Sequence, residues 1–160
     1  MSVHPMHKKE REITDPALMR SILKRGKFAV IALCREGEPY VVTLSYGYDE
    51  AQSVLYFHTA LQGLKLDIIK ANPRACATVI IDRGYLMGEC SHGYRSVVMN
   101  GTMRAVESLA EKKHGMDILL LHLEEDPDAV RRRSLKDDEP YDRTCILRLD
   151  IKDMTGKSGH

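Results

Sequence analysis

The residues with the clearest chemical potential lie in the stretch VLYFHTALQGLKLDIIKANPRA, positions 54–75. A run of strand-forming residues ends there in His58 and Thr59. Gly63 and Lys65 follow, just before an amphipathic segment. The first turn of a helix presents unpaired backbone N–H groups and the positive end of the helix dipole, and together these attract phosphate. The glycine permits close approach of a ligand, and the lysine adds a full positive charge. The spacing therefore predicts a site for a phosphate-bearing ligand.

Lys65 is informative because a helix dipole favours Asp or Glu in the first turn. A lysine there is locally unfavourable and so is a candidate for function. A second basic and polar pair, Arg95-Ser96, opens another predicted strand and could close on the same anion. The alternative is structural: Lys65 would extend over a solvated face, and Gly63 would be an ordinary loop residue.

His58 could act as an acid or a base, because imidazole titrates near neutral pH and can donate a proton to a reduced substrate or bond a cofactor. The structural alternative is a core histidine bonded to a backbone carbonyl. His92, in the glycine-rich segment 83–93, could border the same pocket, but its position in a predicted loop favours solvent.

The cysteines give no sign of a metal site or a disulfide framework. They are widely spaced, with no C-x-x-C pair, at Cys34, Cys76, Cys90 and Cys145. This spacing favours free thiols in a reducing cytoplasm over zinc or disulfides. We therefore expect a cytoplasmic protein without a metal.

Length and charge exclude further classes. The 160 residues suit one domain with a proper core. A net charge of +1 creates no global field to recruit nucleic acid or an acidic membrane. The sequence has no apolar run long enough for a membrane span, and its polar beginning lacks the apolar region of a secretory signal.

The elements that must position these residues follow from periodicity and turn signals. Residues 1–12 are expected to form a flexible arm, and residues 13–160 a single domain. Asp15-Pro16 marks a helix start and Gly26 its end. The predicted elements are, in chain order, a helix at 16–25, strands at 28–34, 40–49 and 54–59, a helix at 61–71, a strand at 74–82, a loop at 83–93, a helix at 109–125 capped by Ser108, a charged excursion at 126–143 and a strand at 144–157.

Residues 94–107 carry two conflicting signals. Asn100-Gly101 between apolar runs is a hairpin signature, whereas one long strand with a bulge at the glycine is the rival interpretation. In sum the sequence predicts an α+β fold with about six mostly antiparallel strands and flanking helices. A sheet of this size with short links often closes into a barrel.

Three strings carry a resemblance to a known family. They are P-Y-V-V-T-L-S-Y-G-Y-D from position 39, L-Y-F-H-T-A-x-x-G-x-K-x-D-x-I-x-x-N-P-R from position 55, and Y-R-S-V-V-x-x-G from position 94. In this order they resemble the pyridoxamine 5′-phosphate oxidase-like family, which has the FMN-binding split-barrel fold. Within it, the chain is most similar to the subgroup related to nitroimidazole-resistance (Nim-type) proteins. The similarity covers about residues 10–157 and favours one long strand at 94–107.

The resemblance implies a homodimer that binds FMN at the subunit interface. It assigns cofactor contacts to the backbone of Val42, Thr43 and Leu44 near the flavin ring, to His58 and Thr59 at the end of the next strand, to Lys65 on the phosphate, and to Ser96 with its neighbour Arg95 on a later strand. His58 is also the expected catalytic residue, because Nim-type relatives carry a histidine there that is held important for reduction of the nitro drug. We expect the dimer interface to involve Tyr46, Tyr48 and the strand 94–103, because a small split barrel leaves an open apolar face.

Departures from the family limit what it implies. The chain has no tryptophan, whereas true pyridoxamine-phosphate oxidases carry one near the C-terminus with an arginine-rich substrate motif. Leu64 stands where those oxidases have arginine. The expectation is therefore an FMN-dependent oxidoreductase that reduces a small nitroaromatic or quinone-like acceptor, with NAD(P)H as a candidate donor. The alternatives are a split barrel that binds haem, with His58 or His92 as axial ligand, or deazaflavin F420, and a flavin-storage protein without turnover.

Overall fold

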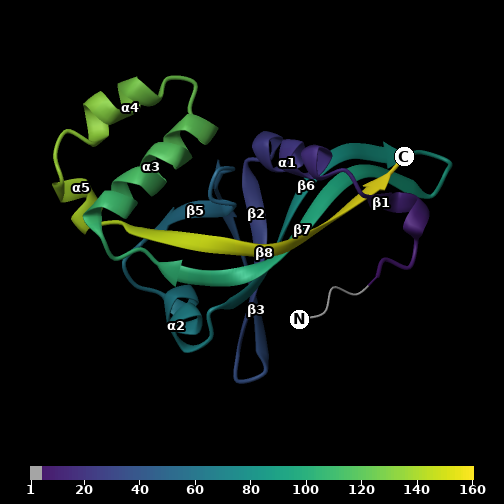
Figure 1. Cartoon of the computed structure of the whole chain (residues 1–160), viewed down its shortest axis with the longest axis horizontal. Helices are drawn as coiled ribbons and strands as arrows, with labels where there is room; N and C mark the ends of the chain where they lie inside the picture. The colour runs from purple at the N-terminus through teal and green to yellow at the C-terminus, as the bar shows by residue number, and fades with distance from the viewer. Residues whose placement is uncertain (1–4) are drawn as a thin grey trace.

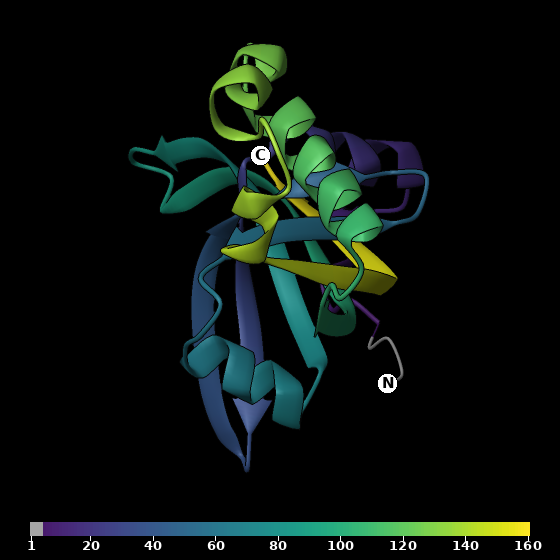
Figure 2. The same cartoon turned by 90° about the vertical axis from the view of Figure 1, so that its left-hand side faces the viewer.

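The computed structural model describes residues 5–160 as one antiparallel sheet flanked by helices (Figure 1). The strand order is β3-β2-β6-β7-β8-β5-β4, and β1 pairs with β8. Because β3 also contacts β5, the sheet curls into a barrel (Figure 2). The strands are β1 (Glu12–Ile13), β2 (Phe28–Arg35), β3 (Glu38–Ser45), β4 (Gly47–Asp49), β5 (Val54–Thr59), β6 (Arg74–Leu86), β7 (Ser91–Ala105) and β8 (Cys145–Gly159).

The helices lie at the periphery of the barrel. α3, α4 and α5 gather at one end of the molecule, while α1 lies toward the other end (Figure 1). α1 packs on β6 and β7, α2 on β2 and β7, and α3 on β4 and β5. The helical bounds are η1 (Lys9–Arg11), α1 (Pro16–Arg25), α2 (Leu64–Ala71), α3 (Leu109–Leu123), α4 (Pro127–Ser134) and α5 (Glu139–Asp142).

The predicted α+β fold is confirmed, with two more strands than the expected six. The two additions are the short strands β1 and β4. Glu12, at the end of the predicted arm, pairs with Lys157 of β8. Residues 1–4 of that arm lie outside the described part of the chain.

The predicted strand 40–49 is divided at Tyr46. The Tyr46 side chain is fully buried, and its hydroxyl donates a 2.6 Å hydrogen bond to the carbonyl of Leu23. Its backbone N–H bonds to the carbonyl of Lys27. The chain therefore turns into the core after Ser45, and β4 pairs with β5 instead of β2. The expectation that Tyr46 lies at a dimer interface is wrong, because this side chain belongs to the core.

The predicted loop 83–93 is also wrong, because β6 and β7 continue through it as a hairpin. Tyr85 pairs with His92 and Leu86 with Ser91, after a register shift beyond Asp82. The number of glycines suggested that this segment is a loop. In the structure, the glycines allow an irregular strand pairing and a tight turn.

Residues 91–105 form one strand, as the family pattern favours. The irregularity at Asn100-Gly101 comes from the neighbouring strand: Asn100 pairs with Asp153 and Gly101 with Ile151, so Lys152 is the extra residue. A Cβ atom at Gly101 would lie 2.0 Å from the carbonyl oxygen of Asp150. The glycine is needed for this close approach, and the bulge itself lies on β8.

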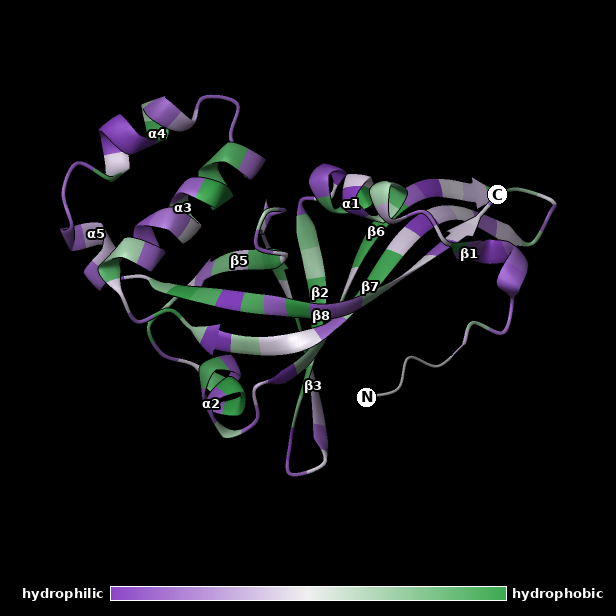
Figure 3. Cartoon of the chain, in the orientation of Figure 1, coloured by the Kyte–Doolittle hydropathy of each residue, from purple (hydrophilic) through white to green (hydrophobic). Residues whose placement is uncertain are grey.

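Two apolar clusters hold the layers together. The larger fills the barrel and includes Leu55, Phe57, Leu147 and Leu149. The smaller joins the opposite side of β5 and β8 to α3, through Val54, Tyr56, Ile146, Leu119 and Val106. Figure 3 shows mainly hydrophobic residues along β2 and β5 and mainly hydrophilic residues along α4.

Candidate functional site

The N-terminus of α2 has the form expected for an anion-binding site. Gly63 precedes the helix with φ +144°, a conformation that favours glycine, and no side chain caps the first turn. The carbonyl of Gly63 accepts from the N–H groups of Leu66 and Asp67. Within residues 5–160, the N–H groups of Leu64 and Lys65 have no hydrogen-bond partner. The helix starts three residues later than predicted, and Lys65 lies in its first turn as expected.

Lys65 is half-buried and lies near the ends of β5 and β8. Burial raises the pKa of the Cys145 thiol, and the positive charges of Lys112 and Lys65 partly oppose that shift. Cys145 is also the cross-strand partner of Thr59. The end of β5, the start of β8 and the first turn of α2 therefore meet. Lys65 forms no ion pair with any residue in the described part of the chain.

His58 and Thr59 point to opposite faces of β5, because successive strand residues alternate. Thr59 lies opposite Cys145, which belongs to the barrel cluster, and His58 lies opposite Ile146, which belongs to the α3 cluster. The His58 side chain is exposed. The alternative of a core histidine is therefore excluded, and the imidazole is open to solutes.

β3, which carries the residues predicted to line a flavin ring, is an edge strand. Val42 and Leu44 pack against the barrel cluster, whereas Thr43 is exposed on the other side. An edge strand has backbone N–H and C=O groups that no neighbouring strand uses. These groups supply the kind of backbone contact that the sequence assigns to positions 42–44.

Arg95 and Ser96 point in opposite directions and cannot close on one anion together. Ser96 lies in register with Ile80 and Lys157, and Arg95 with Ile81 and Ser158. Ile81 packs against the barrel cluster, and Ile80 is exposed. Arg95 therefore lies on the inner side of β7, near α1, and Ser96 on the outer side.

The predicted residues also lie toward opposite ends of the barrel. α2 and Met103 of β7 line the same hollow. Ser96 is seven residues from Met103 along β7, or about 23 Å at the usual rise of a strand. Within one chain, Ser96 and Lys65 are therefore far apart.

The outer side of β3, β2, β6, β7 and β8 forms a broad face, here called the outer face. Strand pairing aligns Thr43, Val30, Thr78, Val98 and Thr155 in one row across it. Several large apolar side chains on this face are exposed, including Phe28 at 54%, Val41 at 61% and Ile80 at 50%. Helices cover the other sides of the sheet, but none packs on this face in the described residues.

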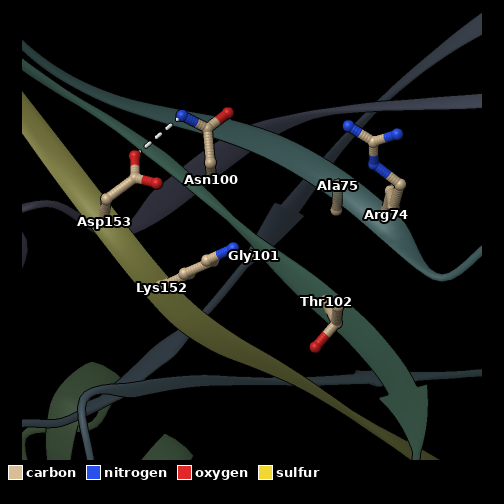
Figure 4. A pocket seen from close by; sticks show the side chains of 7 residues that line it. All are labelled: Arg74, Ala75, Asn100, Gly101, Thr102, Lys152 and Asp153. Carbon is tan, nitrogen blue, oxygen red and sulfur yellow. Dashed lines mark hydrogen bonds between the residues drawn. The ribbon is translucent and has the colours of Figure 1, made fainter. Parts of the chain in front are cut away.

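The β8 bulge creates a hollow of about 450 Å³ on the outer face. Figure 4 shows Lys152, Arg74 and Thr102 around it, and Asn100 donating to Asp153 at 2.9 Å. Sequence reasoning missed these basic residues. The available signal was the break in alternation after Ile151, where two polar residues, Lys152 and Asp153, follow in succession.

The opposite side of β5 carries a polar network under α3 that was also missed. Asp49, only 6% exposed, lies 2.7 Å from His114 Nε2 and accepts two hydrogen bonds from Gln52. Beside it, Arg148 donates to Glu111 at 2.7 Å and to Asp150 at 2.8 Å. These contacts tie α3 to the sheet. Within residues 5–160, no group of three or more His, Cys, Asp or Glu side chains gathers as a metal site would require.

Comparison with known proteins agrees with this architecture. Residues 15–158 match the family described as pyridoxamine 5′-phosphate oxidase. The chain belongs to this family. Among curated proteins, none matches the sequence. No helix in the described part of the chain combines the length and apolar character that a membrane crossing requires.

Solved structures extend the comparison. The chain is similar to a candidate 5-nitroimidazole antibiotic resistance protein from Bacteroides thetaiotaomicron, with 25% identity, a TM-score of 0.76 and coverage of 96% of this chain and 95% of that one. It is similar to a flavocytochrome from Azotobacter vinelandii, with 18% identity, a TM-score of 0.82 and coverage of 98% and 73%. It is also similar to an FAD-binding protein from Mesorhizobium loti, with 22% identity, a TM-score of 0.68 and coverage of 94% and 98%. The last two likenesses establish the fold alone.

Proposed function

We propose that this protein is a homodimeric FMN-dependent oxidoreductase that reduces a small nitroaromatic or quinone-like acceptor. The observation that carries the proposal is the first turn of α2. Two backbone N–H groups without a recorded partner, a glycine at φ +144° and the half-buried Lys65 meet there. This set fits the phosphate of a flavin mononucleotide, because fixed donors and a positive charge are what a phosphate dianion requires.

The remaining contacts would come from neighbouring elements. The edge of β3 would offer backbone groups to the flat ring, and Thr59, at the end of β5, would lie toward the phosphate end. When bound, FMN supplies the electron-transfer chemistry, while the protein supplies position and electrostatics. In this proposal the exposed His58 exchanges a proton with a small acceptor that reaches it from solution.

The homodimer is part of the proposal because Ser96 is far from Lys65 within one chain. The exposed apolar residues of the outer face suit a self-complementary interface around a two-fold axis. Across such an interface, Ser96 and Lys157 of one copy would approach the β3 edge of the other. Arg95 has no place in this arrangement, since it lies on the inner side of β7. Its role as a cofactor contact remains a prediction that the proposal does not use.

The test is the absorbance spectrum of the purified protein after incubation with FMN and removal of free ligand, measured beside Lys65→Ala and Lys70→Ala. Lys70→Ala is the matched control, because it removes the same charge from the last turn of α2. Bound flavin absorbs at about 370 and 450 nm. We expect the parent and Lys70→Ala to retain flavin, and Lys65→Ala to bind it at least about tenfold more weakly, as for loss of a charged hydrogen bond.

The other outcomes separate the parts of the proposal. Equal retention by Lys65→Ala would overturn the assignment of the phosphate to α2. A sharp absorbance band at about 400 nm in place of the flavin bands would identify haem as the cofactor. Two results would contradict the enzyme activity and favour storage. The first is bound flavin that neither NADH nor NADPH bleaches, and the second is reduced flavin that neither a nitroaromatic nor a quinone reoxidises.

A further inference from the structure

A separate cavity lies between α1 and the β6–β7 hairpin. Its volume is about 220 Å³, and three arginines line it: Arg25 from the last turn of α1, Arg83 from the hairpin and Arg95 from β7. It opens on the inner side of β7, away from the outer face and from Ser96. It is therefore distinct from the site proposed for FMN.

The positive charges in this cavity are poorly compensated. Among the described residues, none of the three arginines takes part in a recorded ion pair, and Arg83 donates to the carbonyl of His160 at 3.3 Å. Asp82 also lines the cavity, but its Oδ1 accepts from the backbone N–H of Gly84 and lies 2.7 Å from His92 Nε2. Among the side chains that line the cavity, three guanidinium groups therefore stand against one carboxylate.

Arg95 shows the clearest need for an acceptor. Its Nε atom is buried and has no hydrogen-bond partner within residues 5–160. A buried donor of a charged group without a partner is costly, and the cost disappears when an anion accepts from it. The carbonyls of Ile22 and Leu23 at the end of α1 accept from Gly26 and Tyr46, and neither bonds Arg95 Nε.

We propose that this cavity binds a phosphoryl group, either free phosphate or the phosphate of a small ester. Guanidinium groups present planar forks that match phosphate oxygens, and a dianion would balance the excess charge. A water molecule occupies about 30 Å³ in the liquid. The cavity thus has room for a phosphoryl group and some atoms of an ester, with the half-buried Arg95 as its anchor and the exposed Arg25 and Arg83 at its rim.

The test compares binding of inorganic phosphate by isothermal titration calorimetry, with chloride used to hold ionic strength constant. All variants carry Lys65→Met, so that the α2 site does not contribute. In this background we expect phosphate to bind, Arg95→Met to weaken binding at least about tenfold, as for loss of a charged hydrogen bond, and Arg132→Met to leave it unchanged. Arg132, exposed on α4, is the matched control for the loss of one positive charge.

Each further result decides the proposal. Absence of phosphate binding in the Lys65→Met protein, or equal binding by Arg95→Met, would overturn it. If Arg95→Met does not fold, Arg25→Met and Arg83→Met provide the same test at the exposed rim. If Arg95→Met in an otherwise wild-type chain no longer binds FMN, Arg95 contacts the flavin. That result would overturn the proposal of a phosphate site separate from the FMN site. Tighter binding of adenosine monophosphate than of phosphate would identify an ester as the ligand, and equal binding would identify the free anion.

Discussion

On the side of the sheet that α3 covers, the buried carboxylate of Asp49 is hydrogen-bonded, whereas the outer face leaves apolar side chains exposed. Under α3, Asp49, Gln52 and His114 bond to one another, and Tyr56 and Ile146 complete an apolar layer. On the outer face, Val41 and Ile80 are half or more exposed. The strands under α3 and the strands of the outer face share only β8, and they build two surfaces with opposite properties. The α3 side is a packed and hydrogen-bonded layer, and the outer face is the surface that the proposed homodimer would cover.

The largest expected effect is on the covered side. Asp49→Ala removes the buried acceptor for Gln52 and the partner of His114, two side chains that are themselves partly or fully exposed. We expect a loss of about 2 kcal/mol in the free energy of unfolding, the usual cost of losing hydrogen bonds to a charged group. Urea denaturation followed by circular dichroism measures it.

The matched change on the outer face is Asp153→Ala. Asp153 accepts one hydrogen bond from Asn100 at the rim of the bulge hollow, and its loss should cost under about 1 kcal/mol. Equal losses for Asp49→Ala and Asp153→Ala would remove the distinction between the two faces.

A smaller effect is expected from placing a charge on the outer face. Ile80→Asp should weaken the proposed homodimer at least about tenfold, because a carboxylate would be buried without a partner in the interface. The stability of the monomer should hardly change, since Ile80 is 50% exposed. Sedimentation velocity over a range of concentrations checks this. Leu121→Asp, at an exposed position of α3, is the control, and dissociation by both variants would contradict a specific role of the outer face.

The smallest effect is pH dependence near α3. Burial lowers the pKa of His122, and the positive charge of Lys27 lowers it further. The hydrogen bond to the carbonyl of Gly26 opposes this shift only in part. Its pKa in the unfolded chain, about 6.5, is therefore higher than in the folded protein. The unfolded state binds the proton first, so stability is complete above about pH 6.5 and decreases as the pH falls below it. His122→Gln should reduce this decrease between pH 7 and 5 in thermal unfolding; an unchanged pH profile would assign it to other groups.

Local signals in the sequence predicted much of the fold. Asp15-Pro16 fixes the start of α1, and Ser108 caps α3 as expected, by accepting from the N–H of Glu111. The family pattern correctly favoured one long strand through Asn100-Gly101, but the bulge lies on β8 instead of at the glycine. The hairpin at 83–93 and the break at Tyr46 were missed because they depend on partners distant in sequence, such as Leu23, which no local pattern identifies.

The candidate site shows the same division. Gly63 and Lys65 could be identified from spacing, because a helix N-terminus is a local structure. Joining Arg95 with Ser96 was an error that strand alternation could have prevented, since adjacent residues in a strand face opposite ways. The distance between Ser96 and Lys65 could not be predicted, because it is set by the length and pairing of β7.

The Lys152 bulge has a consequence for the length of the chain. In a regular strand, adding or removing one residue inverts the direction of every side chain that follows. Here Ile151, Met154 and Gly156 all face inward. In a regular strand, Ile151 and Met154 would face the same side only if one residue fewer lay between them. A chain that lacked Lys152 would keep each later side chain on its present face and would lose the bend and the positive charge. This is therefore a place in β8 where homologous sequences can differ by one residue without rebuilding the core.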